Sequence, residues 1–317
     1  MIAVHLLLFA TLVAVAVPRL LPQANWVYRS PQLGLFAWYA VLAVMLSSSL
    51  GAVLSLLVHW PNPRYVACAW WAWCVNTLAG SNGLVDRVFS GVVLVLAGSV
   101  VYRGARETWR TARRAARQRR QHARVLAMVG RSDAELGAMV VQHRQPVAYM
   151  VSGTVVVTSG AIKALPAGQL AAVLAHERAH AAGRHHLLLE CARLLTAAFP
   201  KAAVFAQAHQ QIGRLVELRA DDVAISGHSR LDLARALVTC AEAAAQVTAL
   251  IPVGAVAATG GRALERIERL LAPPTPLPQW ARFAAMAGLV AVLSVPVLLT
   301  ALTKVFPVLA SCLQAQW

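Results

Sequence analysis

Four stretches of the chain are apolar enough to cross a lipid bilayer, and they constrain the fold more than any other feature. They cover residues 2–17, 33–59, 88–102 and 283–303. Hydrophobic residues make up 58% of the 317 residues and charged residues only 13%, which is too apolar for an ordinary soluble domain. The first stretch lacks a basic n-region and an A-x-A cleavage site, so we expect a retained anchor. The sequence predicts a mainly α membrane protein with four transmembrane helices.

The arginines indicate how the chain crosses the membrane. Nine of them lie between residues 103 and 124, directly after the third stretch, and Glu107 is the single acidic residue among them. The positive-inside rule places this end in the cytoplasm, which puts the N-terminus outside and the segment between spans three and four in the cytoplasm. The Ala-, Val- and Arg-rich composition suggests a bacterial protein, and we therefore expect the bacterial plasma membrane as its location.

The net charge of +16 would ordinarily suggest nucleic-acid binding. The arginine run is the one candidate for it, yet this run adjoins a membrane span and contains Trp109 as its only aromatic residue. Topology and attraction to anionic lipid headgroups explain it more simply. We expect the lipid bilayer as a partner and no direct contact with nucleic acid.

The expected organisation has three parts: a three-span membrane region over 1–103, a cytoplasmic domain over 104–282, and a fourth span with a short external tail over 283–317. The middle part is long enough for one compact domain. Within it the sequence predicts a basic helix that ends at 129, a helix over 133–140, a hairpin of strands 147–151 and 154–158, helices over 187–199, 231–250 and 262–271, and a proline-rich linker over 273–278.

An H-E-x-x-H pattern lies in an Ala- and Leu-rich stretch between Pro166 and Gly183, which predicts a helix that begins at the proline and ends at the glycine. On that helix His176 and His180 are one turn apart, so both imidazoles can bind one Zn²⁺. Glu177 lies beside the first histidine, where its carboxylate can take a proton from water and deliver it to a leaving amine. The pattern therefore predicts a catalytic zinc site.

A catalytic zinc ion usually has three protein ligands, and Glu217 is the candidate for the third. It begins an E-x-x-x-D pattern in a segment that favours helix, so Asp221 lies on the same helix face and could orient a ligand imidazole. H-E-x-x-H has only three fixed positions and can arise by chance in a chain with ten histidines. The helix boundaries and the downstream carboxylates together favour the metal site.

Three alternatives stay open at this point. His185 and His186 could be extra ligands, oxyanion stabilisers or polar residues at a helix turn, and the last is favoured because a third ligand already exists. The hairpin could hold an extended substrate peptide by backbone pairing, or it could only cover the domain core. Cys68 and Cys74 could form a disulfide or be two small residues in a Trp-rich interfacial stretch.

Three spans, a domain with H-E-x-x-H and a later E-x-x-x-D, and one further span resemble the BlaR/MecR-type family of integral-membrane zinc metallopeptidases, of the glutamate-zincin kind. Residues 173–180, preceded by Leu165-Pro166 and the Ser-Gly hairpin, are similar to that family's active-site region. The resemblance implies an α+β zincin-like domain between spans three and four.

The resemblance also implies a role for each residue of the two motifs. His176, His180 and Glu217 correspond to the zinc ligands, Glu177 to the general base and Asp221 to the aspartate of the second motif.

Members of this family cleave themselves and a cytoplasmic transcriptional repressor in response to cell-wall antibiotics, so the resemblance implies proteolytic signal transduction. Larger members carry a penicillin-binding sensor domain after the last span. This sequence contains no S-x-x-K acylation motif, and we expect that sensor domain to be missing.

Two other functions share these features. A metallopeptidase that resembles the protein-quality-control or prenyl-protein-processing enzymes would use the same zinc chemistry. A non-enzymatic membrane sensor or scaffold could use zinc only to staple its helices. Glu177 argues against the scaffold, because a structural zinc site needs no base beside its ligand.

Overall fold

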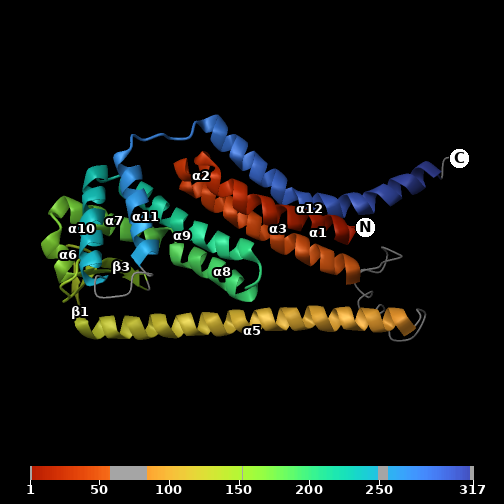
Figure 1. Ribbon diagram of the computed structural model, residues 1–317, viewed down its shortest axis with the longest axis horizontal. Helices are drawn as coiled ribbons and strands as arrows, with labels where there is room; N and C mark the ends of the chain where they lie inside the picture. Colours follow the sequence, from red (N-terminus) through yellow and green to blue (C-terminus); the bar gives the residue numbers. More distant parts are fainter. Residues whose placement is uncertain (1, 58–83, 152, 249–255, 315–317) are drawn as a thin grey trace.

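The structure is a computed structural model that describes residues 2–57, 84–151, 153–248 and 256–314 (Figure 1). Cys68 and Cys74 lie outside these ranges. The described residues form mainly helices: α1 (Ile2–Leu20), η1 (Leu21–Gln23), α2 (Asn25–Arg29), α3 (Pro31–Leu57), α5 (Leu84–Val129), α6 (Ser159–Ala164), α7 (Ala167–Ala182), α8 (His185–Ala198), α9 (Ala203–Ala224), α10 (Arg230–Thr248), α11 (Val256–Leu271) and α12 (Gln279–Gln314). Four strands form one sheet: β1 (Gly130–Asp133), β2 (Ala138–Val141), β3 (Ala148–Val151) and β4 (Thr154–Thr158).

Among the described residues, three helical segments are long and apolar enough to cross a membrane: His5–Gln23, Pro31–Ala52 and Gln279–Leu299. The first lies in α1 and η1, and the others belong to α3 and α12; the helices α1, α3 and α12 pack together and follow the long axis of the molecule (Figure 1). In the most apolar part of the α3 segment 56% of the residues are buried, against 6% in the α12 segment, so α3 is central and α12 exposes its apolar side chains. The chain is therefore a membrane protein, as expected.

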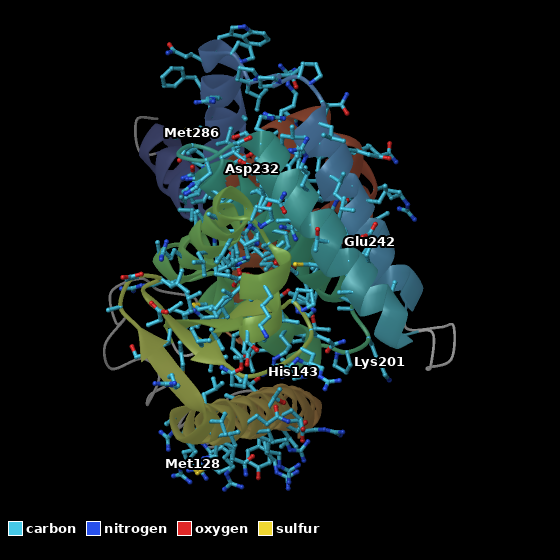
Figure 2. The ribbon with its side chains drawn as sticks, turned by 90° about the vertical axis from the view of Figure 1, so that its left-hand side faces the viewer. Met128, His143, Lys201, Asp232, Glu242 and Met286 are labelled. Carbon is cyan, nitrogen blue, oxygen red and sulfur yellow. The ribbon has the colours of Figure 1, made fainter. Side chains whose placement is uncertain are left out.

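The expected third span, residues 88–102, is part of α5, and most of its side chains lie outside the described residues. Helix α5 continues without a break through the arginine-rich segment and ends at Val129, as the sequence predicted. Four spans and their orientation stay a prediction. Figure 2 looks onto the sheet end of the molecule, where Met128 and many nitrogen-tipped side chains of α5 point outward.

The expected helix over 133–140 is wrong, because this segment forms the β1–β2 hairpin. Asp133 pairs with Ala138, and the Asp133 carboxylate accepts hydrogen bonds from the backbone N–H groups of Glu135 and Leu136. Gly137 has a φ of +53°, a conformation that glycine adopts without strain. The aspartate and glycine together stabilise a turn, and this local chemistry outweighs the helix propensity of the residues between them.

The β3–β4 hairpin is confirmed. Val151 pairs with Thr154 across its loop, and Gly153 has a φ of +86°, which suits a two-residue hairpin loop. The strand order is β1-β2-β4-β3, with β2 and β4 parallel and the other pairs antiparallel. Strand β3 is therefore an edge of the sheet, and it lies against α7.

The buried face of the sheet holds α7 in place. Val155 and Val157 of β4 pack with Leu170 and Leu174 of α7 in one apolar cluster, to which α10 contributes Ala236. Helix α7 runs from Ala167 to Ala182, within the boundaries that the sequence predicted. Helix α7 also packs against α9, so the two motif-bearing helices lie side by side.

Helix α9 also packs against the membrane helices. Its buried Ile212, Leu215 and Leu218 share a core with Trp38 and Val41 of α3. Residues of α1 and α8 complete this cluster. The division of the chain at residues 103 and 282 stays a prediction, but this core joins the first membrane segments to the helix that carries Glu217.

Candidate metal centre

Two imidazoles on α7 form the first half of the centre. His176 and His180 lie one turn apart, with their Nε2 atoms 3.1 Å from each other and their rings edge to face at 4.8 Å. The helix begins after Pro166, whose carbonyl accepts the first helical hydrogen bond from Leu170. It ends at Gly183. The His176 side chain is buried, so its ring has little freedom to turn away.

Glu217 of α9 brings a carboxylate to the same point. Its Oε1 lies 3.5 Å from His180 Nε2, and its Oε2 lies 3.6 Å from His176 Nε2. Ligand atoms of the three residues all lie within 4.8 Å of one another. Zinc bonds of about 2.0–2.1 Å in tetrahedral geometry separate neighbouring ligand atoms by about 3.3–3.4 Å. The donor set and its spacing therefore fit a zinc ion.

Asp221, one turn further along α9, faces the other side of His176. Its Oδ1 lies 2.9 Å from His176 Nδ1, and the Asp221 side chain is only 1% exposed. Because a carboxylate accepts hydrogen bonds, the Nδ1 atom of His176 carries a proton, and Nε2 is the nitrogen that can bind a metal once it has lost its own proton. The E-x-x-x-D pattern thus places two carboxylates on one face of α9: Glu217, a candidate metal ligand, and Asp221, which accepts a hydrogen bond from His176.

Arg266 of α11 is a residue that the sequence reasoning missed. It donates from Nη1 to Glu217 Oε2 at 3.0 Å, and from Nε and Nη2 to the two oxygens of Asp221 at 2.8 and 2.7 Å. Its Nη2 also lies 3.4 Å from His176 Nε2, so the guanidinium borders the space between the ligand atoms. No local pattern distinguishes this arginine from the others, and only the packing of α11 against α10 and its ion pairs with α9 bring it here.

His185 is the second residue whose place the sequence did not reveal. The sequence favoured a polar residue at a helix turn, and His185 does begin α8, but its side chain is buried and its Nδ1 lies 2.9 Å from His180 Nδ1. His186 is exposed beside it.

Burial and the neighbouring charges shift the protonation of the carboxyl groups. Burial raises the pKa of Glu177 to about 7, against the opposing charge of His176. Burial alone would raise the pKa of Asp221, but hydrogen bonds from His176 and Arg266 lower it to about 2. Despite its burial, the pKa of Glu217 is lowered by the hydrogen bond from His176 and by the charge of Arg266. Two carboxylates therefore stay ionised, while Glu177 can exchange a proton near neutral pH.

The histidines respond in opposite directions. Burial alone would lower the pKa of His176, but its hydrogen bonds to Asp221 and Glu217 raise it to about 9. Burial lowers the pKa of His180 to about 4 and lowers that of His185 as well. Metal binding at this centre must displace a proton from His176, whereas His180 is already neutral.

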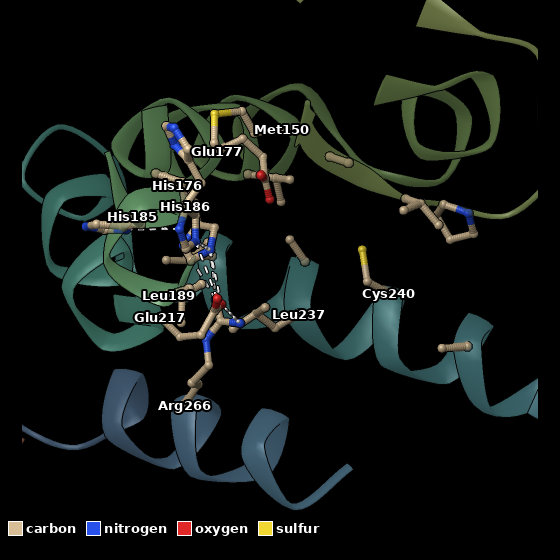
Figure 3. Close-up of a pocket in the computed structure, with 18 residues that line it drawn as sticks. Met150, His176, Glu177, His185, His186, Leu189, Glu217, Leu237, Cys240 and Arg266 are labelled. Atoms are coloured by element: carbon tan, nitrogen blue, oxygen red, sulfur yellow. Dashed lines mark hydrogen bonds and ion pairs between the residues drawn. The ribbon is translucent and has the colours of Figure 1, made fainter. Parts of the chain in front are cut away.

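The metal centre opens into a cavity of about 540 Å³ (Figure 3). Glu177 and the three candidate ligands line one part of it. Most of the other lining residues are apolar and come from β3 and the two residues before it, and from α7, α8 and α10: Pro146, Val147, Ala148, Met150, Val173, Leu189, Leu233, Ala236, Leu237, Cys240 and Ala244. His185, His186 and Arg266 also line the cavity. The arrangement places a base, a metal-binding group and room for a peptide in one space.

The model of peptidase family M48 matches residues 112–273, about half of the chain. The chain belongs to peptidase family M48. No curated protein and no solved structure matches it. The matched region of this M48 peptidase extends from α5 to just beyond α11 and contains all the residues of the centre.

Membership of family M48 confirms the expected enzyme class, a metallopeptidase, and His176, His180 and Glu217 form its candidate metal-binding group. It also supports the broader part of the resemblance, a membrane-type metallopeptidase. The narrower resemblance to the BlaR/MecR type is not tested by this match.

Proposed function

We propose that this M48 peptidase is a multi-pass membrane zinc endopeptidase whose catalytic domain faces the cytoplasm. One observation carries the proposal: ligand atoms of His176, His180 and Glu217 lie within 4.8 Å of one another, and Glu177 lines the same cavity. A zinc site that only stapled helices would need neither a base nor an open cavity beside it. The arginine run of α5 supports the cytoplasmic side for this domain.

In the proposed mechanism, His176, His180 and Glu217 would hold the ion, and Asp221 would keep the proton of His176 on Nδ1 so that Nε2 can face the ion. A bound zinc ion supplies Lewis-acid chemistry, which acidifies water and polarises the scissile carbonyl. Glu177 accepts the proton of the attacking water and then passes it to the departing amine nitrogen. In the metal-free protein, burial raises the pKa of Glu177 to about 7, so its carboxyl group can both gain and lose a proton near neutral pH.

Strand β3 supports an extended peptide as the substrate. It is an edge strand, its residues are only partly buried, and its Ala148 and Met150, with the preceding Val147, line the cavity beside the metal-binding group. A substrate segment that added to this edge would be held by backbone hydrogen bonds, while its side chains met the apolar wall of α10. The alternative, a hairpin that only covers the core, does not explain why the β3 edge lies beside the cavity.

We propose a cytoplasmic protein as the substrate, in particular a transcriptional repressor, with self-cleavage as part of signal transduction. The motif resemblance to the BlaR/MecR type supports this narrower proposal. Quality-control or prenyl-protein-type proteolysis would use the same centre, and so both stay open as alternatives. The bacterial plasma membrane is the proposed location.

The test compares wild type with Glu177→Gln at equal expression in bacterial cells and identifies every protein whose N-termini change. Zinc content of both purified proteins is measured in parallel, with His176→Ala as the control that should lose the metal. We expect Glu177→Gln to retain zinc and to abolish cleavage.

The outcomes separate the alternatives. A transcriptional repressor cut only by wild type supports signalling proteolysis, whereas cuts across many damaged membrane proteins support quality control. Equal zinc content with no difference in any N-terminus would overturn the endopeptidase proposal and favour the scaffold.

A further inference from the structure

A buried histidine, His185, contacts the candidate ligand His180 on the side of the ring that faces away from His176 and Glu217. His185 is 4% exposed, and its Nδ1 atom lies 2.9 Å from Nδ1 of His180. The two rings meet edge to face, with centroids 4.8 Å apart and an interplanar angle of 89°. His180 therefore has one ring nitrogen toward the candidate ligands His176 and Glu217 and the other toward His185.

The conformation of the turn between α7 and α8 places the His185 ring against His180 of α7. Arg184 has a φ of +48°, and it is the only non-glycine residue with a positive φ in the described part of the chain. Such a conformation costs about 1–3 kcal/mol at a residue other than glycine. Gly183 precedes it, and a Cβ at that position would lie 2.7 Å from Cδ2 of His185 and closer still to its Nε2. The backbone is therefore strained at Arg184. The missing side chain of Gly183 leaves the space that the His185 ring occupies.

The hydrogen-bond geometry assigns the protons. If Nε2 of His180 provides the lone pair for a metal, its Nδ1 must carry the hydrogen and donate it. His185 Nδ1 is the acceptor at 2.9 Å, so His185 is neutral with its own hydrogen on Nε2. The first ligand is held in the same way, because His176 Nδ1 meets Asp221 Oδ1 at 2.9 Å. Each candidate histidine ligand has its own acceptor, supplied by α9 for one and by the α7–α8 turn for the other.

We propose that His185 is a positioning residue, which fixes the tautomer and ring orientation of His180 for metal binding. The inference rests on the proposed zinc peptidase function, but it concerns metal affinity and not turnover. A residue that only filled space would be replaceable by any ring of similar size. A positioning residue must instead supply an acceptor at the place of Nδ1.

The experiment measures the zinc dissociation constant of the full-length, detergent-solubilised protein by competition with a chelating dye. His185→Phe retains a ring without an acceptor, whereas His185→Asn can place its amide oxygen near the position of Nδ1. We expect the Phe variant to bind zinc about 10- to 100-fold more weakly, the usual effect of losing such a partner, and the Asn variant to recover most of the affinity. His143→Phe, at an exposed position that does not line the cavity, should bind zinc like wild type.

Gly183→Ala provides a second test that leaves the imidazole in the sequence. Its methyl group would displace the His185 ring, so we expect a loss of zinc affinity in the same direction. Thermal unfolding of each zinc-free variant shows whether it folds. If His185→Phe does not fold, Gly183→Ala and His185→Asn still test the inference.

The inference is overturned if His185→Phe binds zinc as tightly as wild type, or if the folded Asn variant is as weak as the Phe variant. Failure of the proposed function looks different: wild type would then bind zinc through His176 and His180 and cleave no protein.

Discussion

Arg266 holds the carboxylate of Asp221 with two hydrogen bonds, from Nε to Oδ2 at 2.8 Å and from Nη2 to Oδ1 at 2.7 Å. The pair joins α11 to α9, and both side chains are largely removed from solvent, at 14% and 1% exposure. Asp221 also accepts the hydrogen bond of His176. The arginine therefore supports the metal centre through its neighbour.

Replacing Arg266 with leucine should strongly destabilise the fold, because the buried charge of Asp221 would lose its ionic partner. Removing one member of a buried ion pair typically costs about 3–5 kcal/mol. Thermal unfolding of the zinc-free protein in detergent measures the effect. Arg235→Leu, on the exposed side of α10, is the control and should change stability little. If Arg266→Leu is as stable as the control, the Arg266–Asp221 pair makes no net contribution to the free energy of unfolding.

Glu177→Gln should remove activity and, at the same time, stabilise the zinc-free protein at alkaline pH. The folded-state pKa of about 7 lies above the unfolded value of about 4.3. Stability from the neutral carboxyl group is therefore present below pH 4.3 and is lost as the pH rises through 7. Glutamine never ionises, so the variant should gain at most about 3–4 kcal/mol over wild type above pH 7 and nothing near pH 4.

Unfolding midpoints of chelator-treated wild type and Glu177→Gln, compared between pH 5 and 8, measure this difference. When both proteins are loaded with zinc, the rate of peptide hydrolysis should be about 10²–10⁴-fold lower for Glu177→Gln, the usual contribution of a positioned base. A stability difference that does not grow with pH would show that Glu177 is not forced toward its neutral form.

The sequence predicted the ligand helix well because its information is local. The boundaries of α7 follow from Pro166 and Gly183, and the histidine spacing fixes their common face. The sequence also singled out Glu217 as a candidate ligand, since a catalytic zinc usually has three protein ligands and E-x-x-x-D has helical spacing, and the structure brings Glu217 to the two histidines. The β3–β4 hairpin followed from two β-prone runs around a glycine.

The features that the sequence did not reveal depend on tertiary packing or on turn chemistry. Arg266 reaches the centre only because α11 packs beside it. His185 is buried by a strained turn at Arg184 that no composition rule predicts. The β1–β2 hairpin was mistaken for a helix because Asp133 and Gly137 fix the turn by hydrogen bonds and a positive φ, which helix propensity ignores.

Gly160→Ala should destabilise the domain although it adds a single methyl group. A Cβ there would lie 2.8 Å from the carbonyl oxygen of Gln145 and would clash with the backbone of Arg144. Backbone cannot yield as a flexible side chain can, so we expect a loss of about 1–3 kcal/mol. Gly227→Ala is the matched control, since a Cβ at that position meets nothing within 4 Å. Equal unfolding temperatures for the two variants would contradict this account of the loop beside α6.

The core shared by α3 and α9 predicts that the membrane helices stabilise the metal centre. Trp38 of α3 is fully buried among Ile212, Leu215 and Leu218 of α9, the helix that carries Glu217. Trp38→Ala should therefore cost about 3–5 kcal/mol and should loosen zinc binding through α9. Phe36→Ala, two residues away and 57% exposed, changes the other side of the same helix and is the control.

Thermal unfolding and zinc affinity are measured on both variants in the same detergent. If Trp38→Ala melts like Phe36→Ala and binds zinc equally well, α9 is held by the peptidase domain alone, and a fragment over 104–282 should then fold without its membrane helices. If it melts far lower, as we expect, that fragment should aggregate through the exposed apolar face of α9.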